Sequence, residues 1–201
     1  MKKILLLSAL LSIISTNSLA EFQPYIGVSM NSFSLNGDGL STTDLNSGFG
    51  STSAPTRDTG TAIGFTAGAL LNDTKKINLS YFTGKEDVSS VFTVTTTSIS
   101  VDHSFNNEGV HHGWFLGAGL SSVEIKNKPF AYLDASSFSG VGPLIRGGYE
   151  YKYSNQMFWT IGFNLHLTDI DYKFKKMSSS DAGVSTKFDV SNLRFSLNYI
   201  F

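Results

Sequence analysis

The chain has 201 residues, no cysteine, and 15 basic against 16 acidic residues. Without cysteine there can be no disulfide and no thiolate chemistry, and a near-neutral charge without a basic, aromatic-rich patch argues against a nucleic-acid partner. The length is that of a single domain.

Residues 1–20, MKKILLLSALLSIISTNSLA, predict a bacterial secretory signal peptide. Lys2 and Lys3 form the basic start, residues 4–14 are apolar, and Ser18 and Ala20 form a small-x-small cleavage site. The apolar stretch is shorter than the ~20 residues of a membrane-spanning helix, which argues against the alternative of a transmembrane anchor. We expect cleavage after Ala20, export, and one domain over residues 21–201.

After the signal peptide, apolar residues repeatedly alternate with small or polar ones, which is the period of a β-strand, while helical periodicity is scarce. No stretch is apolar enough for a transmembrane helix. In chain order, the predicted strands are Phe22–Phe33, Thr61–Leu71, Lys76–Thr83, Val91–Phe105, Gly113–Ile125, Val141–Tyr153, Met157–Thr168 and Lys187–Phe201. The sequence therefore predicts an all-β chain of eight strands.

The fourth predicted strand changes phase along its length. Phe92 and Val94 are apolar in one phase, whereas Ile99 and Val101 are apolar in the other. A β-bulge adds one residue to a strand and so shifts its phase. We expect such a bulge near Thr95–Thr97.

The connections between these strands alternate between short and long. The short ones are Asn72–Lys75, Asn106–Gly109 and Ser154–Gln156, and the long ones are Ser34–Gly60, Gly84–Ser90, Lys126–Gly140 and Asp169–Thr186. This alternation is typical of an antiparallel up-and-down sheet with two different ends.

The face opposite the apolar residues indicates which solvent the sheet meets. In a water-soluble barrel the outward residues should be largely charged, but here the second face is mainly Gly, Ser, Thr and Asn. Small polar residues suit a narrow lumen, and bulky apolar residues suit hydrocarbon. The sequence thus predicts an eight-stranded antiparallel up-and-down transmembrane β-barrel.

Aromatic residues gather near the ends of the predicted strands, as in the interfacial girdles of membrane barrels. The residues expected in these girdles are Tyr25, Trp114, Tyr149, Tyr151, Tyr153, Phe158, Trp159, Tyr199 and Phe201. We also expect the last strand to pair with the first around Tyr25–Met30, since an open sheet edge is not tolerated in lipid.

The lumen of an eight-stranded barrel is just wide enough for side chains, so charges inside it must be paired. Strand phase turns Arg146, Glu150 and Arg194 toward this lumen. We hypothesise a network in which Glu150 neutralises both arginines, with Glu124 or Asp102 as further candidates. The alternative is that these residues lie at the water-exposed rims.

The stretches PYIGVSM and GWFLGAGLSS and the terminal Phe201, with Tyr199 two residues before it, resemble a known family. It is that of the small eight-stranded outer-membrane barrels of Gram-negative bacteria, the OmpX/Ail-like group and the barrel domain of OmpA. The resemblance covers the mature chain and implies a monomer in the outer membrane, in contact with lipid and lipopolysaccharide. It also implies that Leu197, Tyr199 and Phe201 form an assembly signal for periplasmic chaperones and the outer-membrane assembly machinery.

The histidines do not predict a metal or catalytic centre. His111 and His112 lack a third ligand, and neighbouring strand residues point to opposite faces. His166 is predicted to face the lumen near Asp169 and Asp171, but no catalytic motif accompanies it. We expect no cofactor, no metal site and no enzymatic activity.

The long connections therefore remain as the expected place of function. The resemblance implies a structural or surface-interaction role, such as that of an adhesin, through a ligand bound by these loops. Two alternatives stay open. One is an enzyme that modifies lipid A acyl chains, and the other is a small passive channel, which a filled lumen would limit.

Overall fold

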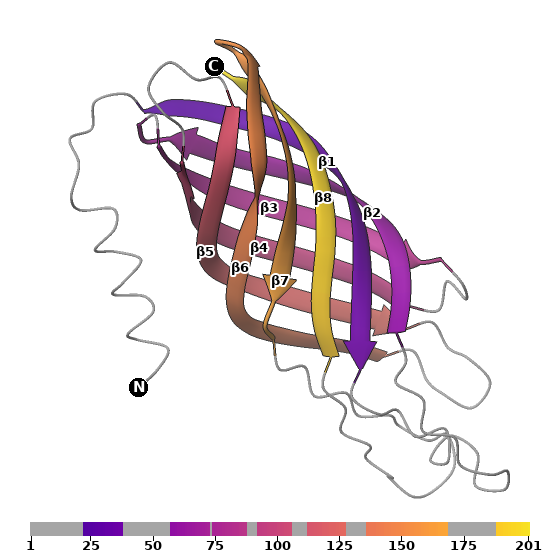
Figure 1. Ribbon diagram of the computed structural model, residues 1–201. Coiled ribbons are helices and arrows are strands. Elements are labelled where there is room, and N and C mark those ends of the chain that lie inside the picture. The colour runs from indigo at the N-terminus through magenta and orange to yellow at the C-terminus, as the bar shows by residue number, and fades with distance from the viewer. Residues whose placement is uncertain are drawn as a thin grey trace, which may run out of the picture.

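The computed structural model describes residues 22–37, 57–72, 74–87, 92–105, 112–127, 136–168 and 188–201. Within these ranges eight antiparallel strands close into a barrel, each paired with its neighbours in sequence (Figure 1). The strands are β1 (Gln23–Gly37), β2 (Arg57–Leu70), β3 (Lys75–Glu86), β4 (Phe92–Ser104), β5 (His112–Asn127), β6 (Ser136–Ser154), β7 (Met157–His166) and β8 (Phe188–Ile200). None of the described residues belongs to a helix long and apolar enough to span a membrane.

The predicted fold class is confirmed, and each predicted strand corresponds to one observed strand. β1 and β6 extend several residues further than expected toward the long connections. The closing pair is also as expected, because β1 and β8 pair from Tyr25 opposite Ile200 to Gly37 opposite Phe188. The predicted signal peptide and most of the long connections lie outside the described residues.

The two ends of the barrel differ in what they carry. One end, here the terminal end, holds the start of β1, the end of β8 and the short β6–β7 turn (Figure 1). At the opposite end, here the loop end, the strands lead into residues 38–56, 88–91, 128–135 and 169–187.

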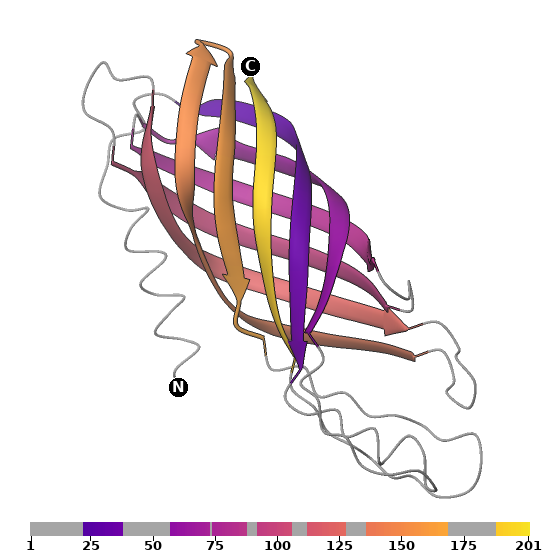
Figure 2. The ribbon, with the colours of Figure 1, turned by 45° about the vertical axis from the view of Figure 1, so that its right-hand side comes forward.

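The strands are tilted, as barrel closure requires (Figure 2). A row of hydrogen-bonded partners followed around the barrel therefore does not return to its starting residue. From Glu150 on β6 the row runs through Thr160, Ser196, Ser29, Gly64, Phe82, Thr96 and Val123 and returns to β6 at Gly140. Each row thus rises toward the loop end in the direction from β6 through β8 and β1 to β5.

The apolar face of the strands changes sides along the barrel. On β1, Ile26, Val28 and Met30 are exposed on the outer wall, whereas Phe33 and Leu35, nearer the loop end, are buried in the lumen. The outer wall is therefore apolar toward the terminal end, and the lumen is apolar toward the loop end.

The predicted bulge in β4 is wrong. The pairing of β4 with both β3 and β5 runs through Thr95–Thr97 without a shift. Val94 is buried in the lumen and Ile99 is exposed on the outer wall. The phase changes because the apolar residues of β4 move from the outer wall to the lumen toward the loop end. In the described ladders, a register shift lies instead between Lys152 and Ser154 of β6.

Two apolar clusters fill the lumen toward its ends. The terminal cluster consists of Tyr25, Leu70, Phe158 and Ile200. The loop-end cluster consists of Phe33, Leu35, Ala62, Phe82, Val94, Val123, Ile125 and Val190, with Phe92 and Phe138 packed against it. Along β8, the residues between the two clusters that face the lumen are polar, namely Asn192, Arg194, Ser196 and Asn198.

Candidate functional site

A layer of paired charges lies in the lumen between the two clusters. Lys76 on β3 forms an ion pair with Glu150 on β6, and its Nζ is 4.0 Å from Oδ2 of Asp102 on β4. Nε of Arg146 on β6 is 3.4 Å from Oδ1 of Asp102. All four side chains are at most 5% exposed. The Lys76–Glu150 pair therefore crosses the lumen between β3 and β6, and the Arg146–Asp102 pair joins β6 to β4.

Further contacts satisfy the charges of this layer. Asn78 Nδ2 donates a hydrogen bond of 2.8 Å to Asp102 Oδ2, and Arg146 Nη1 donates one of 3.1 Å to Ser100 Oγ. The Phe115 ring centroid lies 4.7 Å from Nζ of Lys76 and 5.5 Å from Cζ of Arg146, within range of cation–π attraction. A buried ion pair offsets its desolvation only with such additional partners.

Gly117 makes room for this arrangement. A Cβ at this position on β5 would overlap the Asp102 carboxylate and would lie 3.0 Å from Cγ of Arg146. The glycine thus lets the arginine and the carboxylate approach across the β5 backbone.

The structure places Arg146, Glu150 and Arg194 inside the lumen, with 4%, 4% and 5% of their surface exposed. Asp102, named above as a further candidate, pairs with Arg146, but the partners of Glu150 and Arg194 differ from those we expected. Glu150 pairs with Lys76, and Arg194 donates a hydrogen bond to Thr66 Oγ1. The three residues therefore belong to one polar layer but are not joined through Glu150.

Glu124 is wrong as a lumen partner. It lies on the outer wall, where its Oε2 is 3.2 Å from Lys126 Nζ and its Oε1 accepts a hydrogen bond of 2.6 Å from Ser137. Lys76 was missed, although its phase could have identified it. It alternates with Ile77 and Leu79, whose side chains line the outer wall, and so must face inward.

A hydrogen-bonded group of amides lies between the charged layer and the loop-end cluster. Asn192 Nδ2 donates to Asn31 Oδ1 at 2.9 Å, and Asn192 Oδ1 accepts from Asn164 Nδ2 at 3.1 Å. His166 Nε2 is also 3.1 Å from Asn192 Oδ1, and the His166 ring is 6.0 Å from that of Phe82. His166 is thus buried beside an amide and an aromatic ring.

The other histidines lie on the outer wall where they are described. His103 packs against Phe105, and His112 stacks on Tyr149 and Tyr151. His111, Asp169 and Asp171 lie outside the described residues. In the described part of the chain no group of three potential ligands could hold a metal ion.

Aromatic side chains form a girdle on the outer wall at the terminal end. The ring centroids of Trp114 and Tyr149 are 5.4 Å apart, and those of Tyr151 and Trp159 are 5.7 Å apart. Tyr199 and Phe201 form a further pair at 5.5 Å. This is where an interfacial girdle is expected on a membrane barrel.

Tyr25 and Phe158 do not belong to the girdle, contrary to expectation. Each is 1% exposed, and their rings meet edge to face in the terminal cluster with centroids 5.1 Å apart. The reason is strand phase, because Tyr25 shares its face with Ser29 and Phe158 shares its face with Thr160.

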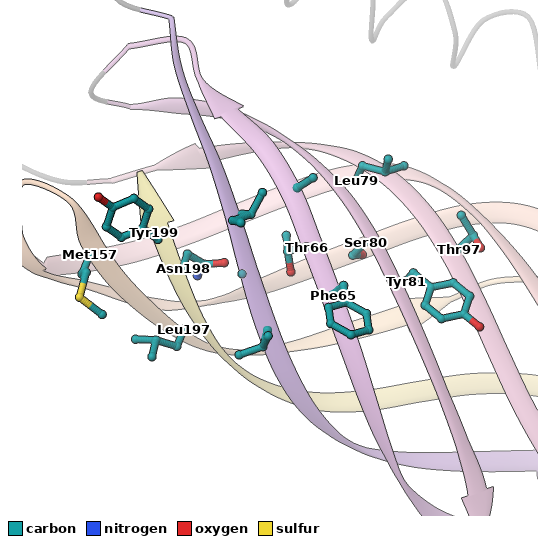
Figure 3. Close-up of a pocket in the computed structure, with 14 residues that line it drawn as sticks. Phe65, Thr66, Leu79, Ser80, Tyr81, Thr97, Met157, Leu197, Asn198 and Tyr199 are labelled. Atoms are coloured by element: carbon teal, nitrogen blue, oxygen red, sulfur yellow. The ribbon is translucent and has the colours of Figure 1, made fainter. Parts of the chain in front are cut away.

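The outer wall carries a shallow groove of about 670 Å³ across β8, β1, β2 and β3 (Figure 3). Phe65, Leu79 and Leu197 contribute to its sides, while Thr66 and Asn198, whose side chains are buried, contribute to its floor. None of the residues lining it is charged. This surface suits contact with hydrocarbon.

Comparison with known proteins assigns this barrel to a family. The model of the outer membrane protein beta-barrel domain matches residues 4–201. The chain belongs to this family of outer-membrane barrels. The family confirms the resemblance noted in the sequence and indicates the outer membrane of a Gram-negative bacterium, so the apolar outer wall faces lipid. No curated protein matches the sequence.

Solved structures share the fold at low identity. Neisserial surface protein A has 13% identity and a TM-score of 0.58, with 88% of this chain and 97% of that chain covered. OprG from Pseudomonas aeruginosa has 11% identity and a TM-score of 0.56, with 89% and 96% covered. AlkL has 17% identity and a TM-score of 0.52, with 93% of each chain covered. These similarities show the fold alone.

Proposed function

We propose that this family member is a surface protein of the outer membrane, with a closed barrel that supports external ligand-binding connections. In this orientation the terminal end faces the periplasm and the loop end faces the outside. Residues 38–56, 88–91, 128–135 and 169–187 then form the external connections. Their role is structural or is the recognition of a surface ligand.

The filled lumen is the observation that carries this proposal. All eight buried members of the loop-end cluster are at most 6% exposed, and the terminal cluster closes the other end. Between them Lys76, Glu150, Asp102 and Arg146 form ion pairs, and Arg194 donates a hydrogen bond to Thr66. Such an interior favours a scaffold over the alternative of a passive channel, since solutes would have to displace two apolar clusters.

Replacing residues 38–56 by a short Gly-Ser linker tests the binding role. We expect the variant to retain heat-dependent gel migration, which reports a folded barrel, and to lose adhesion of whole cells to surfaces that the wild type binds. Replacement of residues 88–91, a much shorter connection, is the control for a general effect of loop exchange. Adhesion that survives replacement of every external connection would contradict the binding role.

Conductance measurements distinguish a closed scaffold from a passive channel. In planar bilayers we expect the purified protein to give no discrete current steps. Discrete steps that disappear in a lumen variant such as Val123→Trp would establish a channel instead.

The position of His166 argues against a lipid-modifying enzyme. Its ring is 2% exposed and is enclosed by the barrel wall, so lipid on the outer wall does not reach it. We expect lipid A from cells that produce His166→Ala to have the same mass spectrum as lipid A from wild-type cells. A changed acyl pattern would revive the enzymatic alternative.

We also propose that the carboxyl-terminal residues Leu197, Tyr199 and Phe201 are recognised during assembly by the outer-membrane machinery. All three are exposed on the outer wall of the closing strand. Phe201→Ser should lower the amount of protein in the outer membrane, with no matching loss of stability after refolding in detergent. Phe105→Ser, at another exposed aromatic residue of the terminal end, is the control and should leave the amount unchanged.

A further inference from the structure

The polar layer between the two apolar clusters holds one cation more than it holds carboxylates. Its cations are Lys76, Arg146 and Arg194, and its carboxylates are Asp102 and Glu150. Both carboxylates are already engaged in the ion pairs with Arg146 and Lys76. Among the described residues, no carboxylate lies within ion-pairing distance of Arg194. The described part of the chain therefore supplies no counterion for this guanidinium.

Glu86 faces the lumen as well, but it belongs to the loop end. It is the last residue of β3, lies beyond Phe82 of the loop-end cluster, and has interactions of its own. The carboxylate whose charge acts on Arg194 is that of Asp102, and Arg146 acts on it as a second cation. Since Asp102 is shared by two other cations, it leaves the charge of Arg194 in excess.

The guanidinium of Arg194 also has more donors than partners. The residue is 5% exposed, and its Nη2 donates a hydrogen bond to Thr66 Oγ1. Its Nε is buried and has no hydrogen-bond partner in the part of the chain that the structure describes. A guanidinium carries five N–H donors, and a buried charge without a counterion is costly. Arg194 therefore offers a ligand both a positive charge and an unused donor.

Buried hydroxyl-bearing residues occupy the positions next to Arg194 in the lumen. The neighbouring lumen-facing residue on β8 is Ser196, whose partners across β7 and β1 are Thr160 and Ser29. Asn31 Nδ2 donates a hydrogen bond of 3.2 Å to Ser29 Oγ, so Ser29 is the acceptor in this contact. Its own hydroxyl hydrogen has no acceptor among the described residues. A second donor is thus available on the strand beside Arg194.

We propose that the lumen binds one small monovalent anion, chloride, beside Nε of Arg194, where it also accepts a hydrogen bond from Ser29. One negative charge balances the excess cation of the layer. The terminal cluster and the loop-end cluster close the lumen on either side, so a larger anion does not fit. Because the unfolded chain lacks the site, chloride stabilises the folded barrel. The site is independent of what the external connections bind.

The chloride dependence of unfolding tests the proposal. The mature protein is unfolded by urea in micelles of an uncharged detergent, and chloride replaces gluconate, a monovalent anion too large for the lumen, at constant ionic strength. Raising chloride from about 10 to about 100 mM should lower the unfolding equilibrium constant about tenfold, as expected for a site that is mostly occupied. Lys126→Gln removes a cation of the outer wall and is the control, which should keep this dependence.

A matched pair of variants at Thr66 tests the place of the anion. Thr66→Asp puts a carboxylate where Oγ1 meets the guanidinium, so Arg194 gains an internal counterion and the chloride dependence should disappear. Thr66→Asn has the same size without the charge, and the dependence should remain. In gluconate alone, Thr66→Asp should unfold at a higher urea concentration than Thr66→Asn. Heat-dependent gel migration confirms that both variants are folded.

Bromide locates the ion directly. In crystals of the wild type grown in sodium bromide we expect one anomalous peak in the lumen, next to Arg194 Nε, and no peak there in crystals of Thr66→Asp. Three outcomes would overturn the anion site. Wild-type unfolding could be the same in chloride and in gluconate, Thr66→Asp could respond to chloride as strongly as Thr66→Asn, or the lumen of the bromide crystals could have no peak.

Discussion

Apart from the terminal cluster, the two halves of the barrel turn opposite kinds of side chain into the lumen. Toward the terminal end the strands turn apolar residues outward and polar ones into the lumen, as Ile26 and Ser29 do on β1. Toward the loop end the same strands turn apolar residues inward and polar ones outward, as Val123 and Glu124 do on β5.

This contrast shows which solvent each half meets. The half near the terminal end has the pattern of a barrel in lipid, where the outer wall must be apolar. The half near the loop end has the pattern of a water-soluble barrel, with an apolar core and a polar surface. The protein therefore continues its barrel beyond the hydrocarbon, and a single strand serves both environments.

Removal of one partner from the charged layer should lower the unfolding free energy as much as any other change proposed below. Glu150→Gln leaves the buried Lys76 with Asp102, 4.0 Å away and shared with Arg146, as its remaining carboxylate, which should cost about 3 kcal/mol of unfolding free energy. Urea unfolding in detergent micelles, followed by tryptophan fluorescence, measures the loss.

The double variant Lys76→Met/Glu150→Leu is its control, because apolar replacement of a buried ion pair is often nearly neutral. It should recover most of the lost stability. If Glu150→Gln alone unfolds at the wild-type urea concentration, the Lys76–Glu150 pair does not stabilise the lumen.

A lysine on the outer wall should reveal where the hydrocarbon ends. Ile99→Lys places a charge in the apolar half of β4 and should cost about 2–4 kcal/mol in lipid vesicles. Thr95→Lys, four residues nearer the loop end on the same face, should cost at most about 1 kcal/mol. Equal costs at the two positions would mean that both halves of β4 meet the same solvent.

The sequence was sufficient for the barrel because period-two alternation depends only on which face each residue takes. It predicted every strand and the closing pair of β1 with β8. It failed where the alternation changed sides, since Phe92 and Val94 carry no local sign of whether the chain has a bulge or the apolar face has moved into the lumen.

Partners inside the lumen were harder to predict for a different reason. Strand phase turned Arg146 and Glu150 inward correctly, but their partners are decided by the stagger of the closed barrel. The stagger brings Lys76, on a distant strand, to the level of Glu150.

A hydroxyl should be tolerated unequally at two neighbouring positions of the lumen. Val123 and Thr96 are direct partners across β5 and β4, and both are buried. Val123→Thr puts a hydroxyl into the loop-end cluster and should cost about 1–3 kcal/mol. Thr96→Val removes a buried hydroxyl that has no hydrogen-bond partner among the described residues and should be neutral or stabilising.

Urea unfolding of both variants measures this difference. The reverse order, with Thr96→Val more costly than Val123→Thr, would show that the Thr96 hydroxyl has a partner such as a bound water. The loop-end cluster would then be less apolar than its side chains indicate.

The smallest loss of unfolding free energy is expected when the Glu124–Lys126 ion pair on the outer wall is broken. Glu124→Gln breaks the 3.2 Å contact with Lys126, but both side chains are well exposed, so the loss should not exceed about 1 kcal/mol. At 1 M salt the difference from the wild type should vanish, because the screening length falls to about 3 Å. The effect of Glu150→Gln should persist at the same salt, since its partner is enclosed by the barrel. A salt-independent loss at Glu124 would instead mean that this carboxylate is shielded from water, and that the lipid boundary on β5 lies closer to the loop end than its side chains indicate.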